Sequence, residues 1–175
     1  MQSRRDFYRI GSCLLGGMMS LGLAIPGISY VLDPLRRKVR AGTTQELTRL
    51  SALKVGVPQA FPIIDERRDT FVKYPREPIG TVWLVRQPEG AATRVVGFTA
   101  SCPHLGCLIA LQADARSFIC HCHGAKFDLK GAPANKVAPR AMDELAVHVA
   151  EGDDPAVVVS FQRFRTQAKK QVPLV

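Results

Sequence analysis

The sequence lacks several features that other classes of protein require. Its 175 residues allow one compact domain and exclude a large multidomain enzyme. After residue 53 no stretch carries a long helical period, and the chain contains no internal repeat and no low-complexity tract. These absences favour a body made of short strands.

Excess charge is missing from the body of the chain. The formal net charge is +9, yet residues 51–160 hold 12 basic and 12 acidic side chains. The surplus lies in residues 1–9, 33–50 and 161–175. Because a nucleic-acid-binding face needs clustered Lys and Arg, we expect no nucleic-acid partner for the body.

Ionisable acids and bases are absent from residues 10–32, a run of 23 residues. As a helix this run would reach about 35 Å, enough to cross a hydrocarbon core of about 30 Å. A cleaved signal usually has a shorter apolar region and a clear cleavage site, and a core helix would show more polar positions. The run is therefore expected to be a retained transmembrane anchor, kinked at Pro26 and Gly27.

An arginine pair precedes this segment, in the order Ser3, Arg4, Arg5, Asp6, Phe7. It looks like a twin-arginine export signal, although an arginine pair can also be a simple cytoplasmic topology anchor. The far flank of the anchor is equally basic, which opposes simple positive-inside insertion with the C-terminus outside. We therefore expect export of a folded, cofactor-loaded domain to the periplasmic side of a bacterial cytoplasmic membrane.

The rest of the chain divides into a tether, a strand-rich body and a basic tail. The tether, residues 33–50, is polar and basic and could begin a helical turn at Thr44. Nine predicted strands suggest an antiparallel sandwich or barrel, at residues 53–57, 70–73, 81–86, 93–99, 107–111, 117–120, 126–129, 145–149 and 156–161. We expect the tail, residues 162–175, to be a solvated extension.

Four of the five cysteines and three of the four histidines fall within 22 residues, 102–123. This clustering indicates metal or disulfide chemistry. A tetrahedral zinc site would leave two cysteines without a task, and a pure disulfide framework would leave the histidines without one. A third interpretation is a site in which both the cysteines and the histidines have a task.

The two boxes of this cluster resemble the signature of Rieske [2Fe–2S] proteins. Residues 102–107 match C-x-H-x-G-C, and residues 120–124 match C-x-C-H-G. The resemblance implies that Cys102 and Cys120 bind one iron, that His104 and His123 bind the other, and that a disulfide joins the loops. That disulfide would link Cys107 to Cys122. The implied fold is an all-β Rieske-type sandwich over residues 51–161 with a small cluster-binding subdomain.

The two additional cysteines are typical of the quinol-oxidising subunits of cytochrome bc complexes. The resemblance therefore implies an electron-transfer subunit that takes an electron from quinol and passes it to a c-type cytochrome, beside a cytochrome b subunit. In the family the second-box histidine, here His123, meets quinol, with His104 as the other iron-binding histidine. A Rieske subunit of another exported redox enzyme, such as an oxidase of a small inorganic substrate, is the alternative, and a structural zinc module is a third.

Two departures from the family concern the reduction potential. Members of high potential carry Ser and Tyr where this chain has Ala125 and Phe127, and their hydroxyls hydrogen-bond the cluster or its ligand sulfur. The missing donors predict a lowered potential, which suits menaquinol better than ubiquinol.

Several residues near the boxes and elsewhere are expected to have plainer roles. His121, which replaces a usual Pro, is expected to be exposed in a loop, and His148 to face solvent from a strand. Cys13 is expected to be a small apolar residue of the anchor. Gly131, Pro133 and Pro139 are expected in a loop that covers the cluster.

Overall fold

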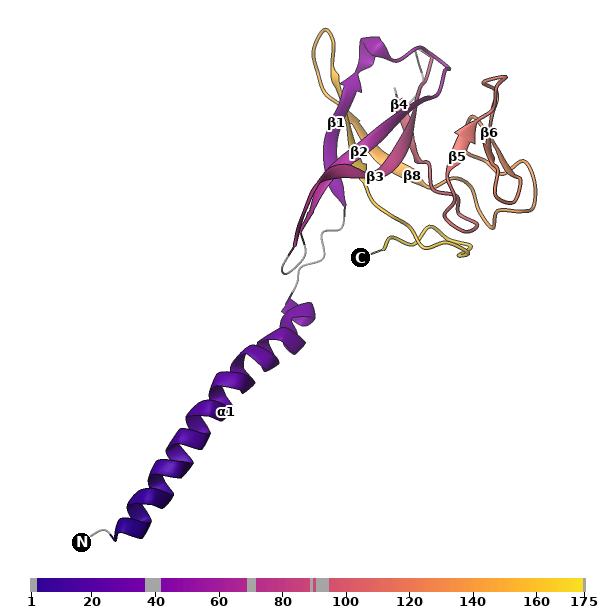
Figure 1. Cartoon of the computed structure of the whole chain (residues 1–175). Coiled ribbons are helices and arrows are strands. Elements are labelled where there is room, and N and C mark those ends of the chain that lie inside the picture. Colours follow the sequence, from indigo (N-terminus) through magenta and orange to yellow (C-terminus); the bar gives the residue numbers. More distant parts are fainter. Residues whose placement is uncertain (1–2, 37–41, 69–71, 89, 91–94, 175) are drawn as a thin grey trace. The chain divides into compact units, whose positions relative to one another are not determined.

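The computed structural model describes residues 3–36, 42–68, 72–88, 90 and 95–174 (Figure 1). The chain separates into two compact units, Met1–Val39 and Arg40–Val175, which we describe one at a time.

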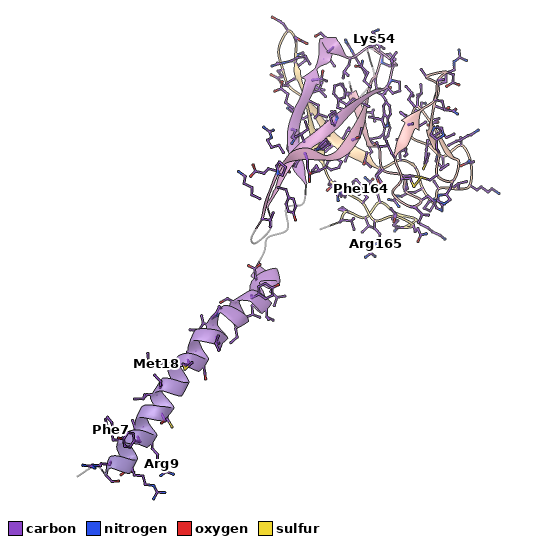
Figure 2. All side chains as sticks on the ribbon, viewed as in Figure 1. Phe7, Arg9, Met18, Lys54, Phe164 and Arg165 are labelled. Carbon is purple, nitrogen blue, oxygen red and sulfur yellow. A yellow bond between two sulfur atoms is a disulfide. The ribbon has the colours of Figure 1, made fainter. Side chains whose placement is uncertain are left out.

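The first unit is a single helix, α1 (Arg4–Arg36). Ser3 caps its start, because its hydroxyl accepts a hydrogen bond from the N–H of Arg5 at 3.2 Å. Large apolar side chains such as Phe7 and Met18 point away from the helix axis and are 69% and 71% exposed (Figure 2). The segment Arg4–Asp33 is long and apolar enough to cross a membrane, so the predicted helix over residues 10–32 is confirmed and extends beyond both of its expected ends.

Much of the tether expected over residues 33–50 belongs to a helix and a strand instead. Its first residues continue α1 to Arg36, and its last residues form strand β1 (Thr43–Arg49). The helical turn expected at Thr44 is therefore wrong, since the Thr44 hydroxyl pairs across strands with that of Ser160 at 3.0 Å. Residues 37–41, which carry most of the basic flank, lie outside the described residues.

A six-stranded antiparallel sheet forms the larger part of the second unit, in the order β1-β9-β8-β4-β3-β2. Its other members are β2 (Gln59–Arg68), β3 (Lys73–Arg86), β4 (Val95–Thr99), β8 (Glu144–Val149) and β9 (Ala156–Phe161). The edge strands β1 and β2 approach each other, because the Thr43 hydroxyl donates to Asp65 at 2.8 Å and the Gln45 amide donates to the Ile64 carbonyl. The sheet is therefore nearly a closed barrel.

Alternating apolar side chains fill the interior of this sheet. Val82 and Leu84 of β3 are fully buried, as are Val157 and Val159 of β9. The spacing of two follows from the pleat of a strand, which sends successive side chains to opposite faces. These residues belong to one hydrophobic core that also includes Leu50, Leu53, Ile63, Val95, Leu145, Phe161 and Phe164.

A second, three-stranded sheet packs on a second hydrophobic core, which also includes Val85 of β3 and Phe98 of β4. The sheet contains β5 (Ile109–Leu111), β6 (Ser117–Cys120) and β7 (Ala125–Asp128), in that order. Trp83 of β3 joins the two sheets: its indole N–H donates to the Ile109 carbonyl at 3.0 Å, and its ring lies 5.4 Å from that of Phe118. The predicted all-β antiparallel head with a small separate subdomain is confirmed.

Several strand predictions differ from the structure. The strand expected at residues 81–86 begins eight residues earlier, at Lys73, as β3. Residues 53–57 are not a strand: they follow a 3-10 turn, η1 (Leu50–Ala52), and only an isolated bridge joins Val55 to Arg86. The long strand β2 was missed because Pro62 and its charged residues resemble a loop, yet Pro is tolerated on an edge strand such as this one. Of the two expected strands at 70–73 and 93–99, residues 70, 71, 93 and 94 lie outside the described residues.

The C-terminal residues fold back onto the body, so the expectation of a solvated tail is wrong. We call residues 162–174 the C-terminal strap. The N–H of Arg165 donates to Val172 at 2.9 Å, and the N–H of Leu174 donates to Arg163 at 2.8 Å. Phe164, which is 8% exposed, packs into the core of the large sheet and fixes the strap there despite its basic neighbours (Figure 2).

Candidate metal centre

The cysteine and histidine boxes lie in two short turns that share the same backbone hydrogen-bond pattern. We call residues 102–107 the first ligand loop and residues 120–124 the second ligand loop. In each loop a glycine N–H donates to the carbonyl of the cysteine four residues earlier, Gly106 to Cys102 at 2.7 Å and Gly124 to Cys120 at 2.9 Å. Both glycines have positive φ, +79° and +70°, which side-chain-bearing residues rarely adopt. The spacing of cysteine and glycine therefore determines both turns.

The two cysteines that begin these loops are not disulfide-bonded and point into the protein. Cys102 and Cys120 are 1% and 2% exposed and belong to the core of the small subdomain. Burial raises the pKa of the Cys102 thiol, and the neighbouring Cys120 side chain adds to this effect. Backbone hydrogen bonds from His104 and Leu105 act in the opposite direction, because they favour a charged sulfur. Burial outweighs these hydrogen bonds, so the pKa of the Cys102 thiol is raised overall.

The two histidines lie together at the surface side of the loops. The ring centroids of His104 and His123 are 4.8 Å apart, and the rings are nearly perpendicular. His104 is half-buried and His123 is exposed. The site thus has an inner pair of sulfur atoms and an outer pair of imidazoles.

A disulfide between Cys107 and Cys122 joins the first ligand loop to the second. The sulfur atoms of Cys107, Cys120 and Cys122 lie within 4.8 Å of one another, as three metal ligands could. Two of these sulfur atoms are already bonded to each other, so this trio cannot supply three thiolates. The thiolate donors left in the two loops are Cys102 and Cys120.

The second ligand loop is covered by residues 131–142, which we call the covering loop. It contains Gly131, Pro133 and Pro139, and Pro133 bridges to Phe127 of β7, so these residues lie beside the second ligand loop, while their expected position over the cluster stays a prediction. Asn135 was not singled out in the sequence, because no local pattern marks it. Its amide N–H donates to the Gly124 carbonyl at 2.7 Å, and its amide oxygen accepts from the N–H of Lys126 at 3.3 Å. Asn135 therefore fixes the end of the second loop.

The remaining histidines lie as expected. His121 is exposed within the second ligand loop, and His148 is exposed on β8.

The positions that carry hydroxyls in high-potential family members are buried and apolar in this chain. Ala125 and Phe127 are both 0% exposed on β7. Ala125 is the cross-strand partner of Cys120 in the pair formed by β6 and β7. Neither side chain can donate a hydrogen bond to sulfur.

Two buried thiols and two adjacent imidazoles on paired loops define this part of the chain as a metal-binding domain of an all-β fold. This donor set suits a Cys₂His₂ zinc ion or a Rieske cluster, in which two histidines replace two cysteines on one iron. The Rieske [2Fe-2S] domain family matches residues 46–151, more than half of the chain. The chain belongs to this family, and its cofactor is a [2Fe–2S] cluster.

Individual relatives are similar over different lengths. The cytochrome b6-f complex iron-sulfur subunit of Prochlorococcus marinus (strain MIT 9215) is 35% identical over 80 residues, which cover 45% of this chain and 44% of that relative. The chain thus spans less than half the length of this relative. The menaquinol:cytochrome c reductase iron-sulfur subunit of Bacillus subtilis (strain 168) is 24% identical over 160 residues, which cover 86% of this chain and 88% of that relative.

A solved structure is similar as well. The cyanobacterial plasma membrane Rieske protein PetC3 from Synechocystis PCC 6803 is 30% identical, with a TM-score of 0.36. The match covers 46% of this chain and 79% of that structure.

Proposed function

We propose that the chain carries electrons from a membrane quinol, menaquinol, to a c-type cytochrome as the iron–sulfur subunit of a quinol:cytochrome c oxidoreductase. The observation that carries this proposal is the pairing of His104 and His123 at the surface of two loops that a disulfide joins. The names of the relatives support it, because they are iron–sulfur subunits of a cytochrome b6-f complex and of a menaquinol:cytochrome c reductase.

In this proposal four side chains would hold the cluster: Cys102 and Cys120 would bind one iron, and His104 and His123 the other. The bound cluster supplies one-electron redox chemistry at a potential raised by its neutral imidazole ligands. The buried cysteines keep water from the inner side, since both are at most 2% exposed. The backbone hydrogen bonds at Cys102 stabilise negative charge on its sulfur.

In this proposal the histidines take part in proton transfer from the quinol. A histidine that binds iron through one ring nitrogen keeps a second nitrogen, and on the exposed His123 this atom is accessible to a quinol hydroxyl. Added negative charge nearby favours the protonated form of that nitrogen. His123 would therefore accept a proton from quinol at the same time as an electron enters the site.

Membrane attachment completes the proposal. Helix α1 anchors the chain, and the arginine pair Arg4 and Arg5 would direct export of the folded head to the periplasmic side. The disulfide between Cys107 and Cys122 is consistent with an oxidising compartment. Cytochrome b and a c-type cytochrome are the proposed partner subunits.

Electron paramagnetic resonance of the reduced full-length protein in detergent tests the cluster and its ligands. We expect a Rieske-type signal that disappears in His123→Ala and Cys102→Ala. The matched control is His121→Ala, because His121 is also exposed in the second ligand loop but is not a proposed ligand. Bound zinc without such a signal, or a normal signal in His123→Ala, would contradict the proposal.

A second measurement tests the quinol. In membranes, inhibitors of quinone sites are expected to shift the signal of the reduced cluster, because they would contact His123. A spectrum unmoved by these inhibitors in membranes containing the complete complex would favour a Rieske subunit of a different redox enzyme.

A further inference from the structure

The C-terminal strap contacts the backbone of the first ligand loop. The N–H of Gln167 donates to the carbonyl of Pro103 at 2.9 Å. Pro103 lies directly between Cys102 and His104 and is fully buried. The strap also reaches the other end of the loop, where a Cβ atom at Gly106 would lie 3.6 Å from the Thr166 methyl group. The backbone that presents both ligands of the first loop therefore rests on residues of the tail.

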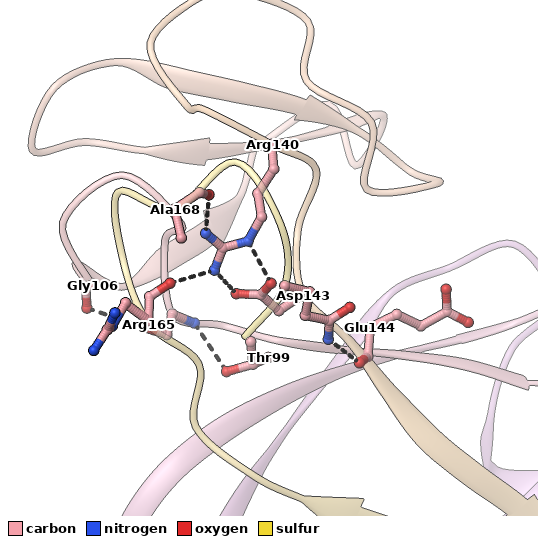
Figure 3. Close-up of polar contacts among 9 residues, drawn as sticks. Thr99, Gly106, Arg140, Asp143, Glu144, Arg165 and Ala168 are labelled. Atoms are coloured by element: carbon pink, nitrogen blue, oxygen red, sulfur yellow. Dashed lines mark hydrogen bonds and ion pairs between the residues drawn. The ribbon is translucent and has the colours of Figure 1, made fainter. Parts of the chain in front are cut away.

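Arg140 of the covering loop holds the strap in place (Figure 3). Its guanidinium donates to the carbonyls of Arg165 at 2.8 Å and Ala168 at 2.6 Å, on either side of Gln167. The same guanidinium forms a two-pronged pair with Asp143, with N···O distances of 2.8 and 2.7 Å. The side chains of this pair are only 8% and 4% exposed.

Gln167 needs such support because its backbone is in an unfavourable conformation. Its φ is +57°, in the left-handed region that residues with side chains seldom adopt. The carbonyls fixed by Arg140 belong to Arg165, two residues before Gln167, and to Ala168, the residue after it, so they restrain the segment that aims the Gln167 N–H at Pro103.

The covering loop also fixes the second ligand loop, through the contacts of Asn135 with Gly124 and Lys126. One continuous set of contacts thus runs from Gly124 through Asn135 and the covering loop to Arg140, and from there through the strap to Pro103. Together with the disulfide, it links the two loops that carry the ligands.

We propose that Arg140, Asp143 and the C-terminal strap form a brace that positions the first ligand loop, and with it Cys102 and His104, for the cluster. Arg140 is a positioning residue in this account, since it acts through Gln167 and Pro103. The inference rests on the ligand set of the proposed function. It assigns to the basic tail a role in the metal centre.

The experiment compares two substitutions at one position in the full-length protein in detergent. Gln167→Val forces a β-branched residue into a positive φ, whereas Gln167→Gly relieves the strain and keeps the N–H. We expect Gln167→Val to broaden the Rieske-type resonance and to speed loss of cluster absorbance in the presence of an iron chelator about tenfold, the lower limit for outer supports of metal ligands. Gln167→Gly is expected to retain the wild-type resonance and rate.

Arg140→Ala tests the other end of the brace and is expected to have the same effect as Gln167→Val. Its matched control is Arg86→Ala: Arg86 also donates to two carbonyls, those of Leu50 and Leu53 at 3.0 and 3.2 Å, but in the large sheet. Arg86→Ala is expected to leave the resonance unchanged. If Arg140→Ala does not fold because Asp143 is left unpaired, the two Gln167 variants decide the question.

The outcomes separate this inference from the proposed function. A wild-type protein without a Rieske-type resonance refutes the proposed ligand set itself. A normal wild-type resonance, combined with wild-type resonance and iron-loss rate in Gln167→Val, refutes the brace alone. A broadened resonance in Gln167→Val but not in Gln167→Gly supports it.

Discussion

Replacing Ala125 with serine is expected to raise the reduction potential of the cluster. Ala125 is the cross-strand partner of Cys120, and side chains of such a pair lie on the same face with Cβ atoms about 4.5–5.5 Å apart. At this spacing a serine hydroxyl at position 125 can reach the Cys120 sulfur. Because Ala125 is 0% exposed, water does not compete for that hydroxyl.

The size of the effect follows from the change in charge on reduction. A hydrogen bond to a charged group contributes about 1.5–3 kcal/mol, and only the part that strengthens when the cluster gains an electron affects the potential. Taking that part as about half gives about 0.75–1.5 kcal/mol, or about 30–65 mV for a one-electron couple. The sign is positive because the donor stabilises the more negative reduced state.

Redox titration of the full-length protein in detergent, followed by the Rieske-type resonance, measures this change. Ala156→Ser in β9 is the matched control, because it adds the same hydroxyl to a buried alanine of the large sheet and is expected to leave the midpoint unchanged. A midpoint of Ala125→Ser equal to or below that of the wild type would refute the reasoning. A wild-type midpoint near the top of the Rieske range, about +300 mV, would remove its premise.

Four further predictions concern the supports of the cluster. Trp83→Phe is expected to lower the free energy of unfolding by about 1–2 kcal/mol in chemical denaturation, since it leaves the Ile109 carbonyl without its donor; an unchanged denaturation midpoint would contradict this. The double substitution Cys107→Ser with Cys122→Ser is expected to cost about 3 kcal/mol, the value for a loop close to its sequence separation of 15, and to lower the temperature at which cluster absorbance is lost. Iron removal is expected to increase hydrogen exchange in β5, β6 and β7 more than in β1, β2 and β9, because Cys102 and Cys120 belong to the second core, whereas these other strands pack on the first; an equal increase in both sets of strands would contradict this. Shortening the expected tether of residues 33–50 within residues 37–42 is expected to slow electron transfer to the cytochrome in stopped-flow measurements and to leave the cluster spectrum unchanged, because we expect the tether to act as a hinge for the head; an unchanged rate would refute the hinge.

Elements with a strong local signal were predictable from the sequence. Strands β6 and β9 were predicted with the bounds observed, and the expected apolar run of residues 10–32 lies within α1. The subdomain around the boxes was expected from their resemblance to the Rieske signature. Each of these depends on residues that are neighbours in the chain, which is why the sequence alone was sufficient.

Elements stabilised by distant residues were missed or misread. The strand β1 reads as a polar tether, and its partner β9 lies more than 100 residues later. The strap reads as a basic tail, yet Phe164 alone inserts into the core and Gln167 contacts a loop far away in the chain. The contacts of Asn135 and those of Arg140 with the strap have no local pattern, because their partners are backbone groups of distant residues that composition does not reveal.

The two ligand loops share one backbone hydrogen-bond pattern, and this has a consequence for how the site can evolve. In each turn a glycine of positive φ donates a hydrogen bond to a cysteine carbonyl, and the side chains of Leu105 and His121 take no part in that bond. Residues such as His121 and Leu105 can therefore vary without refolding the site. Natural selection could adjust the redox partner and the potential through these few positions while both turns persist unchanged.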